Sequence, residues 1–535
     1  ASSDLKYWEA LFLKSSDSNG LLSFIDLDSP RYPYRFYKPA LAPTPPPEFG
    51  KSLGGNGSDG CRAVTVDALG NSYVWGDFAG FMNLGGGGMS AYPGKDLFLA
   101  NYDSSGTFLM QRRFGYTGVE TPRAATLNTS GNLFIAGSFT GTTDLRENAA
   151  NPNSCNCGAA FFDTTLISSG SQDIFLARYN SLAAFSPCAG NTNGACVWAR
   201  SFGGTGFDIA NSITTDIQGN VYMAGSFAGS VDFGSGTPLI AQAGTNDSFL
   251  AKYGPDGQYL WARNFSNSGD DEAVRVAASP DGSVMVAGTY NGTHQLAPVS
   301  IDATCSSFYI ARISAGSSGV PGSVIWSRNA SFSPGISNAV ARATALSVDG
   351  AGNAYVAGYL HTGTNSLGMV LGNNLGLGDA TSTTAAIVPH NTPPLTPDNP
   401  FLAKYSPNGA CLWVKLMEAP LSGKILASCM DSMGFLNVTG TFQDWLAVDG
   451  VTVTNSNPRF DAAFVSRFSQ GGHLQWTRVY GGTDNVTPAD IAANPGGGLV
   501  LVGSYRGTAT LGPLTTSSAN NSIDGFMIQI NPNGN

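Results

Sequence analysis

Short runs of alternating bulky and small residues recur along the chain, and each run begins at a glycine. The clearest is GNVYMAG, which starts at Gly219. Six further copies share its layout: GNSYVWG from Gly70, GNLFIAG from Gly131, GSVMVAG from Gly282, GNAYVAG from Gly352, GFLNVTG from Gly434 and GGLVLVG from Gly497. A glycine-led turn followed by period-two alternation is typical of a strand that leaves a tight turn. Seven copies therefore predict seven structural units.

Each copy lies inside a longer repeat that predicts four strands. A turn-forming residue stands three positions before the first glycine of each copy: Asp67, Asn128, Asp216, Ser279, Asp349, Asp431 and Asn494. Such side chains bond backbone N–H groups two residues on, so each can close a hairpin with the short apolar strand upstream. A third strand follows, such as DSFLAKY from Asp247.

The fourth predicted strand carries an aromatic residue two positions before a basic one. The pairs are Trp198/Arg200, Trp261/Arg263, Trp326/Arg328, Trp413/Lys415 and Trp476/Arg478, with Met110/Arg112 as a weaker copy. Period-two spacing places both members of a pair on one face. Two interpretations are open, an array that stacks on carbohydrate and a packing layer between neighbouring blades. We favour packing.

Seven units of four antiparallel strands predict an all-β protein, a seven-bladed β-propeller. The phrase PEFGKSLGG at residues 47–55 matches the fourth-strand phrase WARSFGG, whereas the last predicted strand, from Asp524, is the third of its unit. The last blade is therefore predicted to close three strands plus one, with residues 48–55 supplying the outermost strand. Phe49 to Leu53 should pair antiparallel with Phe526 to Ile530, which removes an open sheet edge. Residues 47–535 then form the propeller, and residues 1–46 precede it.

Composition and charge agree with this fold class and exclude several partners. Only 12% of the residues are charged and 68 of 535 are glycine, which favours short strands and tight turns over long amphipathic helices. The net charge is −10, and no cluster of lysine and arginine could follow a phosphate backbone. We therefore expect neither nucleic acid nor an anionic membrane surface as partner. No run approaches the ~18 apolar residues of a spanning helix, so no membrane span is expected.

The phrases WARSFGG, SITTDIQGNVYMAGSF and DSFLAKYGPDG resemble the SBBP β-propeller repeat family of bacterial and archaeal secreted and surface proteins. The resemblance covers about residues 48 to 533, and the unit containing CMDSMGFLNVTG departs most from the pattern. It implies the propeller fold and a secreted or cell-surface setting. It implies no single activity, because propellers host many.

Eight cysteines are consistent with disulfides in such a setting. Cys188 and Cys196 flank a short loop between two predicted strands, so we predict a disulfide between them. Cys155 and Cys157 could be structural or could suggest a metal site. No histidine lies near them in sequence, so the structural interpretation is preferred.

Four carboxylates stand eight positions before the hairpin residue in the first four units. They are Asp59, Glu120, Asp208 and Asp271, and the last three units have Ala341, Gly423 and Val486 instead. This half-ring would lie near the channel mouth, on the face where long insertions at residues 140–172 and 359–399 are also predicted. The carboxylates could form a cation or polyol site. Alternatively each accepts backbone N–H bonds in its turn, and this structural interpretation is favoured.

Nothing in the sequence predicts catalysis or a cofactor. The four histidines, His294, His361, His390 and His473, have no second ligand at metal-binding spacing, and no nucleophile elbow or phosphate-binding loop is present. We therefore expect no enzyme activity and no cofactor.

Residues 1–46 match no repeat, and they predict an arm with a short helix, a strand and a proline-rich extended segment. Leu5, Trp8, Leu11 and Phe12 would share one face of the helix. The arm could dock on its own blades or on a neighbouring subunit. From the second possibility we predict a secreted or cell-surface structural propeller that assembles with itself into an extracellular filament or layer. The alternative is an extracellular ligand-binding or glycan-binding propeller without catalysis.

Overall fold

The computed structural model describes residues 48–115, 118–145, 165–181, 196–294, 296, 305–332, 340–361, 369–371, 385–387 and 398–534. The predicted arm at residues 1–46 lies outside these ranges, together with its residues Leu5, Trp8, Leu11 and Phe12. Within the described ranges the regular structure consists of β-strands and one short 3-10 helix, η2 (Ala519–Asn521). No helix there has the length and apolarity needed to cross a membrane.

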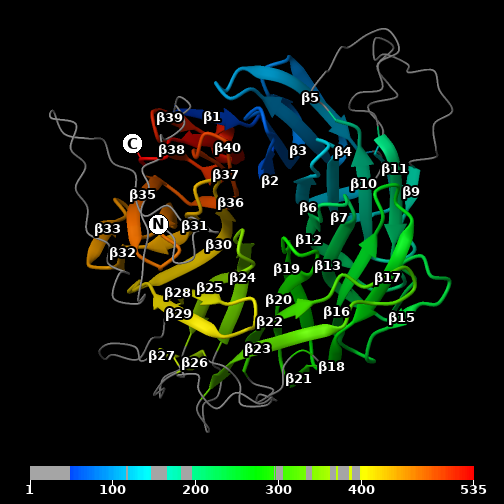
Figure 1. Cartoon of the computed structure of the whole chain (residues 1–535). Helices are drawn as coiled ribbons and strands as arrows, with labels where there is room; N and C mark the ends of the chain where they lie inside the picture. Colours follow the sequence, from blue (N-terminus) through cyan, green and yellow to red (C-terminus); the bar gives the residue numbers. More distant parts are fainter. Residues whose placement is uncertain are drawn as a thin grey trace.

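Seven antiparallel sheets surround a common axis, which confirms the predicted seven-bladed propeller (Figure 1). From the axis outward, blade one contains β2 (Gly60–Val66), β3 (Ser72–Asn83), β4 (Gly88–Tyr102) and β5 (Phe108–Phe114). Blade two contains β6 (Val119–Leu127), β7 (Leu133–Thr140), β10 (Asp173–Tyr179) and β11 (Cys196–Phe202). Blade three contains β12 (Ile209–Thr215), β13 (Val221–Ala228), β16 (Asn246–Tyr253) and β17 (Tyr259–Asn264).

The remaining blades repeat this order. Blade four contains β19 (Asp271–Ala278), β20 (Val284–Tyr290), β22 (Ser307–Ile313) and β23 (Val324–Phe332). Blade five contains β24 (Val340–Val348), β25 (Ala354–His361), β28 (Asn399–Tyr405) and β29 (Cys411–Leu416). Blade six contains β30 (Ser422–Met430), β31 (Leu436–Gln443), β34 (Ala462–Phe468) and β35 (Leu474–Gly482). Blade seven contains β36 (Val486–Ala493), β37 (Leu499–Arg506), β40 (Ile523–Ile530) and β1 (Phe49–Leu53).

Short strand pairs lie in the connections outside the four-stranded blades. Five are hairpins between second and third strands: β8 (Thr142–Asp144) with β9 (Thr165–Ile167), β14 (Ser230–Val231) with β15 (Leu239–Ile240), β26 (Met369–Leu371) with β27 (Ala385–Ile387), β32 (Trp445–Val448) with β33 (Val451–Thr454), and β38 (Thr508–Leu511) with β39 (Leu514–Ser517). The sixth pair joins β18 (Ser266–Ser268), which precedes blade four, to β21 (Thr293–His294), which follows its second strand. Two of them extend the preceding blade, because β26 pairs with β23 and β38 pairs with β35.

The ring closes through β1, as predicted. This strand pairs antiparallel with β40, with Phe49 opposite Gln529 and Leu53 opposite Gly525. The observed partners therefore lie one residue before the predicted segment. Leu53 is buried where blade seven meets blade one. Blade seven thus joins segments near both ends of the described chain (Figure 1).

Apolar side chains fill each seam between neighbouring blades, and seven hydrophobic clusters correspond to the seven seams. A polar contact, which we call the latch, recurs at the outer part of the seams. In blade four, Trp326 Nε1 and Arg312 Nη1 both donate to the carbonyl of Pro407, in the last turn of blade five, at 2.8 and 2.5 Å. Other Trp Nε1 atoms reach the equivalent carbonyl of the next blade: Trp198 to Pro255, Trp261 to Ala315, Trp413 to Gln470 and Trp476 to Pro532. The repeated tryptophans therefore pack between blades, as the packing interpretation predicted.

Candidate binding site in the central channel

The innermost strand of every blade carries a β-bulge at the same place. The bulged residue lies five positions before the hairpin residue and has no partner on the second strand; the seven are Arg62, Arg123, Asn211, Val274, Thr344, Leu426 and Ala489. A bulge re-aims the side chain of the extra residue. The repeat therefore presents seven side chains of six different types at one level of the axis.

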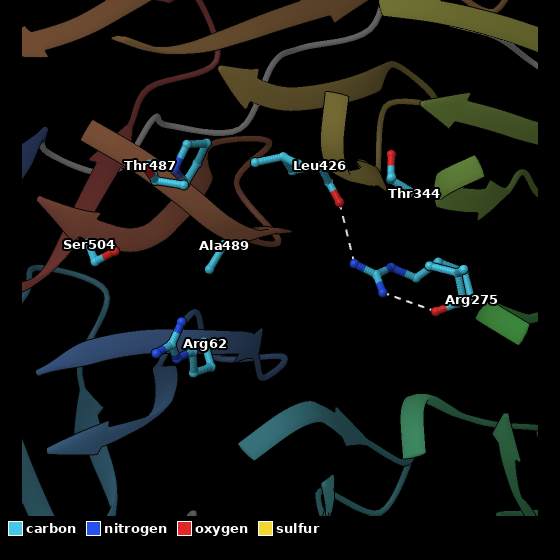
Figure 2. Close-up of a pocket in the computed structure, with 9 residues that line it drawn as sticks. Arg62, Arg275, Thr344, Leu426, Thr487, Ala489 and Ser504 are labelled. Carbon is cyan, nitrogen blue, oxygen red and sulfur yellow. Dashed lines mark hydrogen bonds between the residues drawn. The ribbon is translucent and has the colours of Figure 1, made fainter. Parts of the chain in front are cut away.

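A cavity of about 310 Å³ occupies this level of the channel (Figure 2). Its lining residues are Arg62, Val274, Arg275, Thr344, Leu426, Thr487, Pro488, Ala489 and Ser504. Figure 2 shows Arg62, on β2, and Arg275, on β19, on two sides of the open space. Residues from five blades thus meet around one small chamber.

Arg62 is held by a carboxylate of its own blade. Its Nε lies 2.5 Å from Oδ1 of Asp77, and Lys95 Nζ lies 2.6 Å from Oδ2 of the same residue. The side chain of Arg62 keeps 44% of its surface accessible, whereas that of Asp77 keeps 4%. One buried carboxylate therefore serves two cations, and this trio retains a net positive charge.

Arg275 is held by main-chain carbonyls instead. Its Nη1 donates to the carbonyl of Val274 at 3.0 Å and its Nη2 to that of Leu426 at 3.3 Å, across the channel in blade six (Figure 2). Burial lowers the pKa of Arg275, attraction to Asp490 and Glu272 opposes this shift, and repulsion from Arg123 adds to it. The cost of burying this guanidinium is therefore only partly offset within the chain.

Asp490 and Glu272 are engaged elsewhere. Asp490 Oδ2 accepts the backbone N–H of Val64 at 2.9 Å, and burial raises the pKa of Asp490 to about 6. Glu272 Oε1 accepts from Asn211 Nδ2 at 2.9 Å. Both carboxylates are thus fixed by hydrogen bonds to other partners.

Arg123, the bulged residue of blade two, completes a group of three arginines. Burial lowers the pKa of Arg123, Glu272 opposes the shift by attraction, and Arg62 adds to it by repulsion. In the described part of the chain neither Arg123 nor Arg275 has a carboxylate oxygen within ion-pair distance. Three guanidinium groups therefore influence one another around the axis, and of the three only Arg62 has a carboxylate at ion-pair distance among the described residues, which it shares with Lys95.

The predicted acidic half-ring lies in the blade cores and not on the channel wall. Asp59 and Asp208, just before β2 and β12, are 1% and 0% exposed. Asp59 accepts the N–H groups of Gly55 at 2.7 Å and Ala79 at 3.1 Å. Asp208 accepts those of Gly204 and Ala228 at 2.9 and 3.2 Å. For these two the structural interpretation holds, and burial raises the pKa of each to about 6.

Glu120 and Asp271 begin β6 and β19 and are equally buried, each 1% exposed. Ala341, Gly423 and Val486 occupy the same level in blades five to seven, so the ring is acidic on one side only. Across the described ranges, no three residues of the types His, Cys, Asp and Glu are placed to hold a metal ion together.

The predicted disulfide is not shown. Cys196 has no disulfide partner among the described residues, and its Sγ lies 3.5 Å from the carbonyl of Trp198. Its predicted partner Cys188 lies outside the described residues, as do Cys155 and Cys157. The bridge remains a prediction.

His294 belongs to the seam between blades three and four, away from the channel lining. Its Nε2 lies 3.1 Å from Ser248 Oγ, its Nδ1 accepts the N–H of Leu296 at 3.1 Å, and its ring stacks on Tyr309 at 4.2 Å. Burial lowers the pKa of His294 to about 3. The imidazole is therefore neutral and structural.

The channel arginines were missed by sequence reasoning, which compared the repeats only at the level of the carboxylates. The same comparison at the fifth position before the hairpin residue would have found Arg62 and Arg123. At the fourth position, five units have Ala or Ser, whereas blades four and seven have Arg275 and Asp490. Charged residues at positions where other repeats have small or apolar residues were therefore the sequence signal for the channel site.

Comparisons with known proteins found several distant similarities. The chain is 22% identical over 460 residues to an uncharacterized WD repeat-containing protein of Acanthamoeba polyphaga mimivirus, covering 77% of this chain but only 31% of that protein. Among solved structures, Sqt1 of Chaetomium thermophilum is similar at 12% identity and a TM-score of 0.39, over 85% of this chain and 97% of that one. A protein of unknown function from Dyadobacter fermentans is similar at 9% identity and a TM-score of 0.36, over 90% and 98%.

The family comparison identifies the repeat itself. Residues 197–226 match the family described as SBBP, a beta-propeller repeat. The match runs from β11 at the edge of blade two through β12 and most of β13 in blade three, so the sequence repeat is offset from the blade by one strand. The suspected resemblance is thereby confirmed: residues 197–226 are an SBBP beta-propeller repeat.

Proposed function

We propose that the chain is a ligand-binding propeller and that the cavity around Arg62 and Arg275 is its binding site. The observation that supports this is that Arg275, in the cavity lining, and Arg123 have no carboxylate oxygen at ion-pair distance among the described residues, while Arg62 shares Asp77 with Lys95. Arg275 is partly buried, and burying a charge without a partner costs free energy, so a ligand that supplies an anionic partner would stabilise the chain. A chamber of about 310 Å³ is at the lower end of the size range of small-molecule sites.

The proposal includes binding without a catalytic step. The lining offers guanidinium groups, the hydroxyls of Thr344, Thr487 and Ser504, and apolar side chains, which are groups that orient a ligand. This choice follows the prediction of a non-enzymatic chain. The cavity and its polar lining support the binding function that the sequence analysis held as the alternative to self-assembly.

We place this propeller outside the cell, either secreted or on the surface. The support is the SBBP repeat at residues 197–226, because the resemblance implies an extracellular setting. Fractionation of the source cells, with immunodetection of the chain, tests this location.

A thermal-shift screen of small polar molecules, repeated on a variant with a filled channel, tests the binding function. Ala489→Trp places a bulky ring at the bulge of blade seven, inside the lining. Leu412→Trp is the matched control, because Leu412 is 51% exposed on the outer strand β29. Compounds that stabilise the protein should lose their effect on Ala489→Trp and keep it on Leu412→Trp. Equal stabilisation of both variants would place the site elsewhere.

Self-assembly into a filament or layer is the second candidate. In the described ranges, the outer strands β5 and β29 each pair with one strand only, and they expose Leu109 and Leu412 at 48% and 51%. Exposed apolar strand edges can accept an added strand from another subunit. The arm that we predict as that strand lies outside the described residues. Deletion of residues 1–45 should leave a folded monomer, while the full chain forms assemblies visible by negative-stain microscopy. A truncated chain that still assembles would exclude the arm.

A further inference from the structure

We propose that the channel binds an oxyanion, a carboxylate or a phosphate group, between Arg62, Arg123 and Arg275. This inference rests on the proposed binding function and specifies its ligand. Arg62 and Arg123 are the bulged residues of blades one and two, and Arg275 follows the bulged residue of blade four. Arg62 and Arg275 line the cavity, although the chain as a whole has a net charge of −10.

The positive charge of this group is not balanced by the carboxylates near it. Arg62 shares Asp77 with Lys95, and the side chains of Arg123 and Arg275 have no carboxylate oxygen at ion-pair distance among the described residues. Arg123 repels both Arg62 and Arg275. An anion between the guanidinium groups would relieve this repulsion and supply the missing hydrogen-bond acceptors.

The two remaining carboxylates attract the arginines from a greater distance but do not take the place of a ligand. Glu272 is bonded to Asn211, the bulged residue of blade three, and Asp490 is bonded to the backbone of Val64. They lower the charge of the site, so an anion meets a moderate positive field. Asp490 is the carboxylate that competes most directly with a ligand for Arg275.

The rest of the lining indicates what the anion is attached to. Thr487 and Ser504 are cross-strand partners on β36 and β37, so their side chains line the cavity side by side. Val274, Leu426 and Pro488 add apolar surface. A small hydroxylated body with one oxyanion would match hydroxyls and aliphatic groups on one side and guanidinium groups on the other.

Three sugars that differ in one substituent test the inference on the full chain by isothermal titration calorimetry. Glucuronate carries a carboxylate, glucose 6-phosphate carries a phosphate, and glucose carries neither. We expect glucuronate, glucose 6-phosphate or both to bind, and glucose to bind more weakly by about tenfold or more, the loss expected for one charged hydrogen bond. Binding of only one of the two anions identifies which oxyanion the site accepts.

Substitutions then locate the binding. Arg123→Gln removes a guanidinium that makes no hydrogen bond within the described ranges, so it should fold normally and weaken anion binding about tenfold or more. Arg275→Lys keeps the charge but loses the planar fork, and it should weaken binding as well. Asp490→Asn removes the competing charge and should strengthen binding. Lys415→Gln, on the outer strand β29, is the control and should leave the affinity unchanged.

Each contrary result has a distinct meaning. Equal affinity for glucose and glucuronate, no binding of any of the three sugars, or full affinity in Arg123→Gln would overturn the oxyanion site. The proposed binding function would still stand if a neutral compound bound the protein and lost its effect on Ala489→Trp. Anion binding that Ala489→Trp leaves intact would place the anion outside the channel and overturn both.

Discussion

Replacing Gly409 by alanine tests whether the latch between blades contributes to stability. Gly409 ends the turn between β28 and β29, where its N–H donates to the carbonyl of Ser406 at 2.8 Å. Its φ is +80°, and a Cβ atom added there would lie 2.7 Å from Cδ2 of Trp326 in the preceding blade. The ring of Trp326 cannot withdraw without losing its 2.8 Å hydrogen bond to Pro407.

Gly352 provides the matched control in the same blade. It also ends a four-residue turn, with its N–H donating to Asp349 at 2.9 Å, and its φ is also +80°. A Cβ added at Gly352 would meet nothing closer than Pro407 Cγ at 3.6 Å. Gly352→Ala should therefore cost only the left-handed strain, about 1 kcal/mol after the gain from a stiffer unfolded chain. Gly409→Ala should cost about 1–3 kcal/mol more, the usual penalty for overpacking.

The assay is equilibrium unfolding in urea, followed by both far-ultraviolet circular dichroism and tryptophan fluorescence. Gly409→Ala should unfold at a clearly lower urea concentration than Gly352→Ala. In a Trp326→Ala background the added methyl has room, so the two substitutions should then cost about the same. If the two alanine variants lost the same free energy of unfolding in the wild-type background, close packing of Trp326 on this turn would not stabilise the propeller.

Three further predictions concern closure, pH and the cysteines. Leu53→Asp puts a charge into the seam between blades seven and one, where Leu53 is 2% exposed, and should lower stability by at least about 2 kcal/mol; an unchanged melting temperature would contradict the closure energetics. His294 has a folded-state pKa of about 3 against an ordinary 6.5, so the unfolded chain takes up its proton first as the pH falls. The stability advantage of the wild type over His294→Gln should be complete above pH 6.5 and shrink by about 1.4 kcal/mol per pH unit below it, whereas an advantage independent of pH would exclude burial of the neutral ring. Cys188 and Cys196 should resist thiol labelling in the native protein without reductant, and labelling at either position would refute the bridge.

The blade count and the closure could be predicted because each repeat carries its own turn chemistry. The hairpin residues bond as expected; Asp216, for example, accepts the N–H groups of Gln218 and Asn220 at 3.0 and 2.9 Å. The predicted register of β1 against β40 was wrong by one residue, because the prediction paired two segments without comparing them residue by residue with another blade. Phe49 corresponds to Trp261, which lies opposite Lys252, and the residue equivalent to Lys252 in blade seven is Gln529, the observed partner.

The channel lining could not be predicted from strand alternation because a bulge is a property of the backbone. In a regular strand, successive side chains point to opposite faces of the sheet. One extra residue at a bulge reverses this assignment for all residues on the far side of the bulge. Each innermost strand contains such a residue between the hairpin and the predicted carboxylate position. The carboxylates Asp59 and Asp208 were predicted near the channel mouth because they precede the innermost strands, and the structure buries both in their turns. Arg62 and Arg123 are the extra residues of their strands, so alternation alone does not show that they face the channel.

Differences among the repeats define the chemistry of the axis. At the bulge, blades one to three present Arg62, Arg123 and Asn211, whereas blades four to seven present Val274, Thr344, Leu426 and Ala489. If all seven repeats were identical, seven equal charges would face one another across a narrow channel and repel strongly. Restricting arginine at the bulge to blades one and two avoids this repulsion, and Val274, Leu426 and Ala489 present apolar side chains at the bulges of blades four, six and seven. A ligand entering the channel would then be oriented with its anionic end toward Arg62, Arg123 and Arg275. A backbone feature that recurs in every blade, but carries different side chains, therefore gives the site a defined orientation.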